Sequence, residues 1–145
     1  MIKYENDFFS WTQEQAGLLK AKNFSEIDID NLIEEIEAMG RSEKRELQSR
    51  LAVLLMHLLK WRYQPIRRSK SWTLTIQGQR IDVLDVLEDN PGLKHQLDAI
   101  LSHAYRSARI SAAKETGLDL QIFPNACPWP FSDIMDNDFY PDDCL

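Results

Sequence analysis

The chain has 145 residues, a formal net charge of −6 and 43% hydrophobic residues, a composition typical of a folded globular protein. Its longest apolar run, residues 51–59, is shorter than the roughly 20 residues that a membrane-spanning helix needs, and the charged first ten residues match neither a secretory signal nor a lipidation motif. We therefore expect a single helical domain over residues 1–145, without a membrane partner and located in the cytoplasm.

The composition favours helices over strands. Eighteen leucines stand against three valines and four threonines, and β-branched residues are the ones enriched in strands. We expect an all-α fold, a bundle of four main helices with a long central helix and a Pro-rich C-terminal segment packed on it. The two cysteines, Cys127 and Cys144, do not form a CxxC pair, so free thiols are expected.

Apolar spacing predicts the first two helices. The first runs over residues 7–22 and is capped by Asn6 or Asp7, and residues 23–28 connect it to the second. The second begins at Asp28 or Asp30 and continues through Gly40 to about Tyr63, because one interior glycine costs up to about 1 kcal/mol, little against the packing of a long apolar stripe. The stripe consists of Leu32, Ile36, Met39, Leu47, Leu51, Leu54 and Leu58.

A polar loop around Pro65 precedes the third helix, which we expect to be capped by Ser69 or Ser71 and closed by residues 88–90, with Gly78 weakening its middle. Its predicted apolar face consists of Trp72, Ile76, Val83, Leu84 and Leu87.

The fourth helix is predicted to follow Asn90 as its cap, with Pro91 at the first helical position, and to end at Gly117 in a left-handed conformation. Residues 118–145 contain four of the six prolines, six acidic residues and no lysine or arginine. We expect a mostly irregular segment with a short helix near residues 132–136. Its aromatic residues should pack onto the bundle, namely Phe123, Trp129, Phe131 and Phe139.

Several long motifs carry a resemblance to a known family. They read YENDFFSWTQEQAGLLK, LIEEIEAMGRSEKRELQSRLAVLLMHLLKW, RSKSWTLTIQGQR and ETGLDLQIFPNACPWP. The chain resembles the bacterial domain-of-unknown-function family number twenty-nine over nearly its whole length. The resemblance implies a compact all-α bacterial domain without an established activity, so it supplies no catalytic residue.

Charge is unevenly distributed along the chain: residues 1–40 carry −6, residues 41–80 carry +8 and residues 81–145 carry −8. Residues 60–80, here called the basic strip, alternate cations with aromatic rings and contain no acidic residue. Guanidinium groups and exposed rings suit phosphate contact and base stacking. The candidate binding residues are Lys60, Trp61, Arg62, Arg67, Arg68, Lys70, Trp72 and Arg80.

A structural interpretation of the basic strip is the preferred one. In it, the acidic segments fold back onto the cations, and the tryptophans fill the core. The sequence pI near 5.0 supports this interpretation, because nucleic-acid-binding domains are usually basic.

Glu34, Glu35 and Glu37 with His57 suggest a metal site of the helical-bundle type. On a continuous helix, however, Glu37 and His57 would be about 30 Å apart at ~1.5 Å per residue, and no Glu-x-x-His motif is present. We expect no metal ion at these residues. We expect His57 to be a hydrogen-bonded residue at the edge of the core. His95 and His103 are expected at the surface.

No nucleophile motif and no phosphate-binding loop occurs in the sequence, so no catalytic residue and no cofactor is predicted. The preferred function is a non-enzymatic interaction or regulatory module that acts on a protein partner, with homo-oligomer formation also open. Charge segregation favours such oriented docking. Two alternatives stay open, namely nucleic-acid binding through the basic strip and a metal-dependent enzyme that uses Glu34 to Glu37 with His57.

Overall fold

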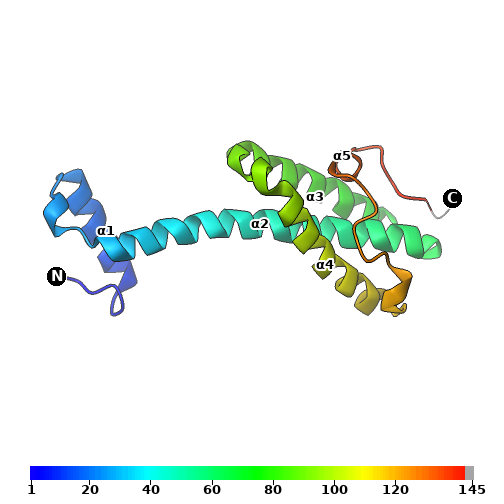
Figure 1. Cartoon of the computed structure of the whole chain (residues 1–145), viewed down its shortest axis with the longest axis horizontal. Coiled ribbons are helices and arrows are strands. Elements are labelled where there is room, and N and C mark those ends of the chain that lie inside the picture. The colour runs from blue at the N-terminus through cyan, green and yellow to red at the C-terminus, as the bar shows by residue number, and fades with distance from the viewer. Residues whose placement is uncertain (143–145) are drawn as a thin grey trace. The chain divides into compact units, whose positions relative to one another are not determined.

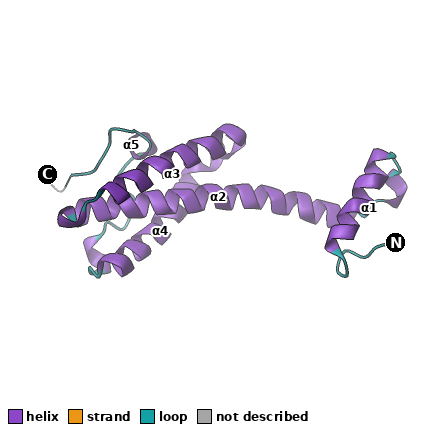
Figure 2. Ribbon diagram, turned by 180° about the vertical axis from the view of Figure 1, so that it is seen from behind, coloured by secondary structure: helices purple, strands orange, loops and turns teal. Residues whose placement is uncertain are grey.

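Helices account for all the regular secondary structure that the computed structural model describes, which covers residues 1–142 (Figures 1 and 2). The predicted all-α fold with a long central helix is confirmed. None of the helices in this range is long and apolar enough to cross a membrane. The α-helices are α1 (Phe8–Lys20), α2 (Ile29–Tyr63), α3 (Lys70–Asp89), α4 (Leu97–Thr116) and α5 (Phe131–Ile134). Short 3₁₀ helices are η1 (Phe24–Glu26), η2 (Pro65–Arg67), η3 (Pro91–Gln96) and η4 (Leu120–Ile122).

Three predicted caps begin the first three α-helices. The Asp7 side chain accepts from Ser10 N at 3.0 Å, the Asp28 side chain from Asn31 N at 3.5 Å and the Ser69 hydroxyl from Trp72 N at 3.3 Å. These bonds satisfy backbone N–H groups that have no partner within a helix. α2 then runs for 35 residues without a break at Gly40, as predicted.

The start of the fourth helix differs from the prediction. Pro91 begins η3, and α4 starts only at Leu97. The reason lies in the side chain of Asn90. Its Nδ2 donates to Val86 O, four residues earlier, and to the Glu43 carboxylate, each at 3.0 Å. Asn90 therefore closes α3 instead of capping an α-helix that begins at Pro91. Gly117 ends α4 with φ +73°, the left-handed conformation that was predicted.

Packing divides the chain into two compact units, Met1–Arg41 and Ser42–Leu145. They are called here the N-terminal unit and the C-terminal unit, and α2 contributes to both. The N-terminal unit contains α1, η1 and the start of α2, while the C-terminal unit contains the rest of α2 and all later helices.

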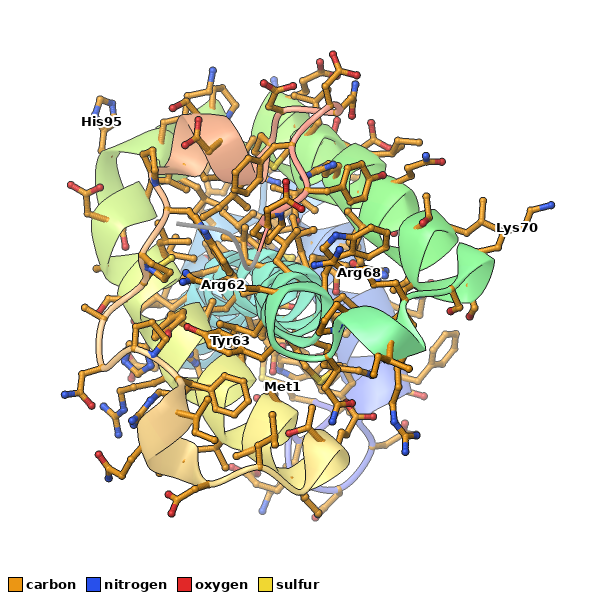
Figure 3. The ribbon with its side chains drawn as sticks, turned by 90° about the vertical axis from the view of Figure 1, so that its right-hand side faces the viewer. Met1, Arg62, Tyr63, Arg68, Lys70 and His95 are labelled. Carbon is orange, nitrogen blue, oxygen red and sulfur yellow. The ribbon has the colours of Figure 1, made fainter. Side chains whose placement is uncertain are left out.

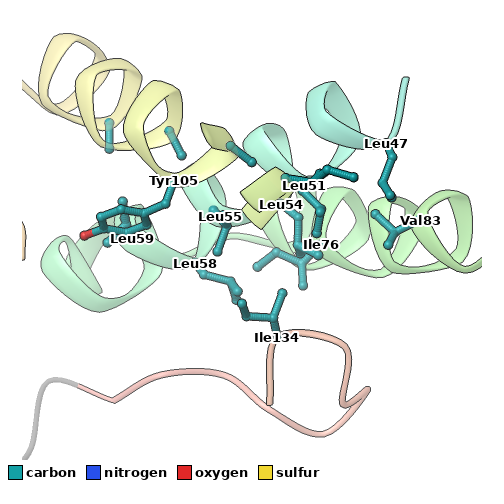
Figure 4. Close-up of a cluster of buried hydrophobic side chains, with 14 of the residues drawn as sticks. Leu47, Leu51, Leu54, Leu55, Leu58, Leu59, Ile76, Val83, Tyr105 and Ile134 are labelled. Carbon is teal, nitrogen blue, oxygen red and sulfur yellow. The ribbon is translucent and has the colours of Figure 1, made fainter. Parts of the chain in front are cut away.

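The C-terminal unit is organised around leucines of α2 (Figure 4). Side chains from α3, α4 and the C-terminal segment cover this part of α2, and Phe123 and Ile134 are buried with them. Trp129, Phe131 and Phe139 are half-buried against the same core, so the predicted packing of the C-terminal segment is confirmed. The core leucines of α2 are Leu47, Leu51, Leu54, Leu55, Leu58 and Leu59.

Three predicted core positions are exposed. Leu84 is 50% exposed because it lies one residue beyond Val83, and each residue turns a helix by 100°. Ile36 and Met39 are 60% and 61% exposed, although they continue the apolar stripe of α2. The N-terminal unit has just one other α-helix to cover this part of α2, whereas the C-terminal unit has several.

Two glycines of the C-terminal unit should respond in opposite ways to alanine. Gly78→Ala in the middle of α3 should raise the free energy of unfolding by up to about 1 kcal/mol, because a Cβ there meets nothing within 4 Å and alanine favours a helix. Gly117→Ala should lower it by about 1 kcal/mol, because φ is +73°. Urea unfolding of both variants checks the prediction, and two changes of the same sign would contradict it.

Candidate functional site

Arg80 of the basic strip is a buried structural residue and not a surface cation. It is 2% exposed, and its guanidinium holds the irregular C-terminal segment through backbone carbonyls. Nε donates to Ile134 O at 2.8 Å, Nη1 to Asn137 O at 3.4 Å and Nη2 to Phe139 O at 2.6 Å. The guanidinium also lies 5.4 Å from the centre of the Tyr140 ring. Burial lowers the pKa of Arg80, and the carbonyls provide acceptors for its N–H groups.

Arg68 and Trp61 are likewise held within the C-terminal unit. Arg68 Nε donates to Trp61 O at 2.7 Å, and its guanidinium lies 5.1 Å from the centre of the Trp61 ring. A longer ion pair of 3.9 Å joins Arg68 to Asp142 of the acidic C-terminal segment. Trp61 also contacts Tyr140, with ring centres 4.9 Å apart. Part of the acidic segment therefore does fold back onto the strip.

The remaining strip residues differ in exposure. Lys60 is mostly buried, pairs with Glu115 at 3.7 Å and lies 4.8 Å from the centre of the half-buried Trp72 ring. Arg62 is half-buried, with its guanidinium 5.0 Å from the ring centre of Tyr63.

Lys70 points away from the ribbon in Figure 3, whereas Arg62 and Arg68 lie beside the end of α2. Arg67 and Lys70 are exposed. The strip thus does not present its eight candidate residues as one surface.

The residues considered for a metal site have other partners. Glu34 and Glu37 pair with Arg41 at 3.3 and 3.9 Å, and Glu35 accepts from the Tyr4 hydroxyl. Within residues 1–142, no group of three or more His, Cys, Asp or Glu side chains is arranged to hold a metal ion.

His57 is half-buried, and its Nδ1 donates to Val53 O at 2.9 Å, as expected for the edge of a core. Burial lowers the pKa of His57. His95 and His103 are exposed, as expected, and His95 extends outward in Figure 3.

Cys127 is a packed thiol. It is half-buried against the core, and its Sγ donates to Trp129 O at 3.4 Å. Burial raises the pKa of Cys127, which disfavours the reactive thiolate. Cys144 lies outside the residues that the structure describes.

A cavity lined mostly by apolar side chains is a groove of the N-terminal unit, formed by α1 and the start of α2. Its volume is about 300 Å³. We call it the apolar groove. Its lining residues are Phe8, Trp11, Thr12, Gln15, Ala16 and Leu19 from α1, and Leu32, Glu35, Ile36 and Met39 from α2. Glu35 is the one ionisable side chain among them.

Asp28 fixes α1 against the start of α2. Its carboxylate accepts from Asn31 Nδ2 at 2.9 Å and from the indole N–H of buried Trp11 at 3.0 Å. These hydrogen bonds lower the pKa of Asp28. The backbone N–H of Asp28 in turn donates to Gln15 Oε1 at 2.7 Å. Trp11 and Gln15, the buried residues of α1, are thus both hydrogen-bonded to Asp28.

Aromatic contacts join Tyr4 to Phe8 and Trp11, which line the groove. The Tyr4 ring centre lies 4.8 Å from that of Trp11, and the Phe8 ring centre lies 5.9 Å from it. The hydrogen bond from Tyr4 to Glu35 raises the pKa of Tyr4 to about 12. Tyr4 thus remains a neutral donor to Glu35 at physiological pH.

Gln15 is a buried polar residue of the groove lining that the sequence analysis did not single out. The residue is 1% exposed, and its Oε1 accepts a hydrogen bond from Asp28 N, which fixes the orientation of the side-chain amide. Its Nε2 is buried and has no hydrogen-bond partner among the described residues. A buried donor without an acceptor is costly, so a ligand that offers one gains affinity. The signal in the sequence was a glutamine on the apolar face of α1, four residues after Trp11.

Replacing Arg80 should destabilise the C-terminal unit. Arg80→Met keeps most of the side-chain volume but leaves three carbonyls without their donor, and should lower the free energy of unfolding by at least about 2 kcal/mol. Arg67→Met, at an exposed position, is the matched control and should change it by less than about 0.5 kcal/mol. Urea unfolding measures both, and equal effects would contradict the structural role of Arg80.

His57 should make stability depend on pH. Because its pKa in the folded chain is below the ordinary 6.5, the unfolded chain binds the proton more readily, and the free energy of unfolding should fall as pH decreases from 7 to 5. His57→Gln should show a smaller fall over this range, and His95→Gln, at an exposed site, should match the parent. Urea unfolding at pH 7, 6 and 5 tests this, and a parent-like slope in His57→Gln would disprove it.

Comparison with known proteins gives one match, to a family. The family described as "Domain of unknown function DUF29" matches residues 3–140. Searches of curated proteins and of solved structures gave no match. The matched region covers both units, including the apolar groove and the basic strip. With nearly its whole length matched, the chain belongs to the DUF29 family.

Proposed function

We propose that the protein is an interaction module whose apolar groove binds an amphipathic α-helix of a partner protein, with basic residues beside the apolar face of that helix. The observation that carries this proposal is the groove itself, which combines apolar walls with the unpartnered Nε2 of buried Gln15.

Exposed apolar side chains are concentrated in the N-terminal unit. Of the fifteen large apolar residues that are exposed in the described chain, nine precede residue 42. Ile36 and Met39 in the groove are 60% and 61% exposed, and Phe8, which also lines it, is 50% exposed. Contiguous apolar surface of this kind marks sites of protein association.

A helix is the occupant that suits this groove. Two packed helices present ridges and a groove that accept the side chains of a third helix at positions i, i+3, i+4 and i+7. The last turn of a helix has carbonyl groups without internal partners. One of these carbonyls can accept from Gln15 Nε2, which would place the C-terminal end of the bound helix beside Gln15.

Charge favours a basic partner. The N-terminal unit contains nine acidic and four basic residues, and Glu35 lies in the groove wall. Lysine or arginine residues beside the apolar face of the bound helix would be attracted to this surface. Such complementarity accelerates association and selects among partners.

Selection from a random library of 20-residue displayed peptides tests the proposal with the full chain as bait. Selected peptides should show apolar residues at i, i+3, i+4 and i+7 together with lysine or arginine. Ile36→Asp should weaken binding of a selected peptide at least tenfold, because it places a charge in the groove. Ile110→Asp is the matched control, since Ile110 is 61% exposed on α4, and should bind as the parent does. Peptides without this pattern, or equal loss in both variants, would overturn the proposal.

The role of Gln15 has a separate test. Gln15→Glu keeps an oxygen for Asp28 N and removes the unpartnered N–H donor. It should weaken the same peptide, while the near-ultraviolet circular dichroism signal of the tryptophans stays that of the parent. Unchanged affinity with an unchanged spectrum would show that Gln15 does not contact the peptide.

A further inference from the structure

α3 has a second apolar face that no part of the described chain covers. Its buried face contains Ile76, Val83 and Leu87. On the opposite face Leu74 is 55% exposed, Ile81 61% and Leu84 50%. At 100° per residue, these three side chains project within a narrow sector, and Lys70, Gln77 and Glu88 share it. This sector is called here the outer face of α3.

We propose that the outer face binds the outer face of a second copy of the chain, with the two α3 helices antiparallel. A two-fold axis at the level of residue 79 brings Leu74 opposite Leu84 of the second copy. The same register brings Gln77 opposite Ile81 and Lys70 opposite Glu88, because each pair is equally spaced about residue 79. Because the two copies are related by a two-fold axis, each of these residue pairs occurs twice in the dimer.

The charges on α3 select the antiparallel orientation. The start of the helix is basic, with exposed Lys70 and with exposed Arg67 just before it in η2, and its end is acidic, with exposed Asp85, Glu88 and Asp89. An antiparallel pair places each basic end beside an acidic end, whereas a parallel pair would place like charges together. Among residues 1–142, neither Lys70 nor Glu88 has an ion-pair partner within 4.0 Å. Both charges are therefore free to pair between copies.

The contact is small, and this sets the kind of dimer expected. Stable protein interfaces bury roughly 1,200–2,000 Å² in total. One helix from each copy contributes three large apolar side chains, far fewer than the roughly 20–30 residues that each side of a standard interface provides. The dimer should therefore dissociate on dilution. It involves the C-terminal unit and does not depend on the apolar groove.

Sedimentation velocity of the full chain over a concentration series, at low ionic strength, tests the pairing. The parent should change from monomer to dimer as its concentration rises. Lys70→Glu and Glu88→Lys should each raise the dimer dissociation constant at least tenfold, because like charges then face each other twice. The double variant restores opposite charges, and its dissociation constant should return to within threefold of the parent value.

Further variants separate this contact from any other association. Leu84→Asp should abolish the dimer, while Ile110→Asp should leave it intact, although both place a charge at an exposed apolar position. Ile36→Asp in the apolar groove should also leave it intact, so failure of this proposal is distinct from failure of the proposed function. A monomer at every concentration would overturn the pairing. So would a dimer that the double variant fails to restore.

Discussion

The structure of the C-terminal unit depends on the burial of the leucines in the second half of α2. Leu51, Leu54 and Leu58 lie at the helical period, and all are fully buried. They belong to one cluster of buried side chains with residues of α3, α4 and the C-terminal segment, so these elements share one core although they are distant in sequence. Because interiors are packed at crystal-like density, a change at one of these leucines affects all the elements around it.

The N-terminal unit is stabilised in a different way. It buries Trp11 and Gln15 and relies on a polar network centred on Asp28, which joins α1 to the start of α2. Ile36 and Met39 of this unit remain exposed and can make further apolar contacts. The C-terminal unit thus has a closed apolar core, whereas the N-terminal unit leaves part of its apolar surface exposed.

Local sequence signals predicted most of the helices and their caps. Asp7, Ser69 and Gly117 act through their own short-range chemistry, and the structure confirms each of them. Burial was harder to predict, because periodicity shows which residues share a face but not what covers that face. Ile36 and Leu84 illustrate this limit, since both follow an apolar period and both are exposed.

The candidate sites show the same limit for polar residues. The sequence grouped Arg80 with the candidate binding residues of the basic strip, and its guanidinium is buried among carbonyls of residues 134–139, about 55 positions further along the chain. No local pattern encodes such a distant contact. Gln15 was missed because its environment also depends on the fold. Its Oε1 accepts from Asp28 N, whereas its buried Nε2 has no partner among the described residues.

The Arg80 contacts have a consequence for synthesis on the ribosome. α3 is complete long before residues 134–139 emerge, so during that interval its central cation has none of the carbonyls that later surround it. Burying that cation against α2 at this stage would leave it without acceptors. The buried position of Arg80 in the C-terminal unit therefore requires residues 134–139. A chain that ended before this segment would have to leave the Arg80 guanidinium in water or bury it without these acceptors.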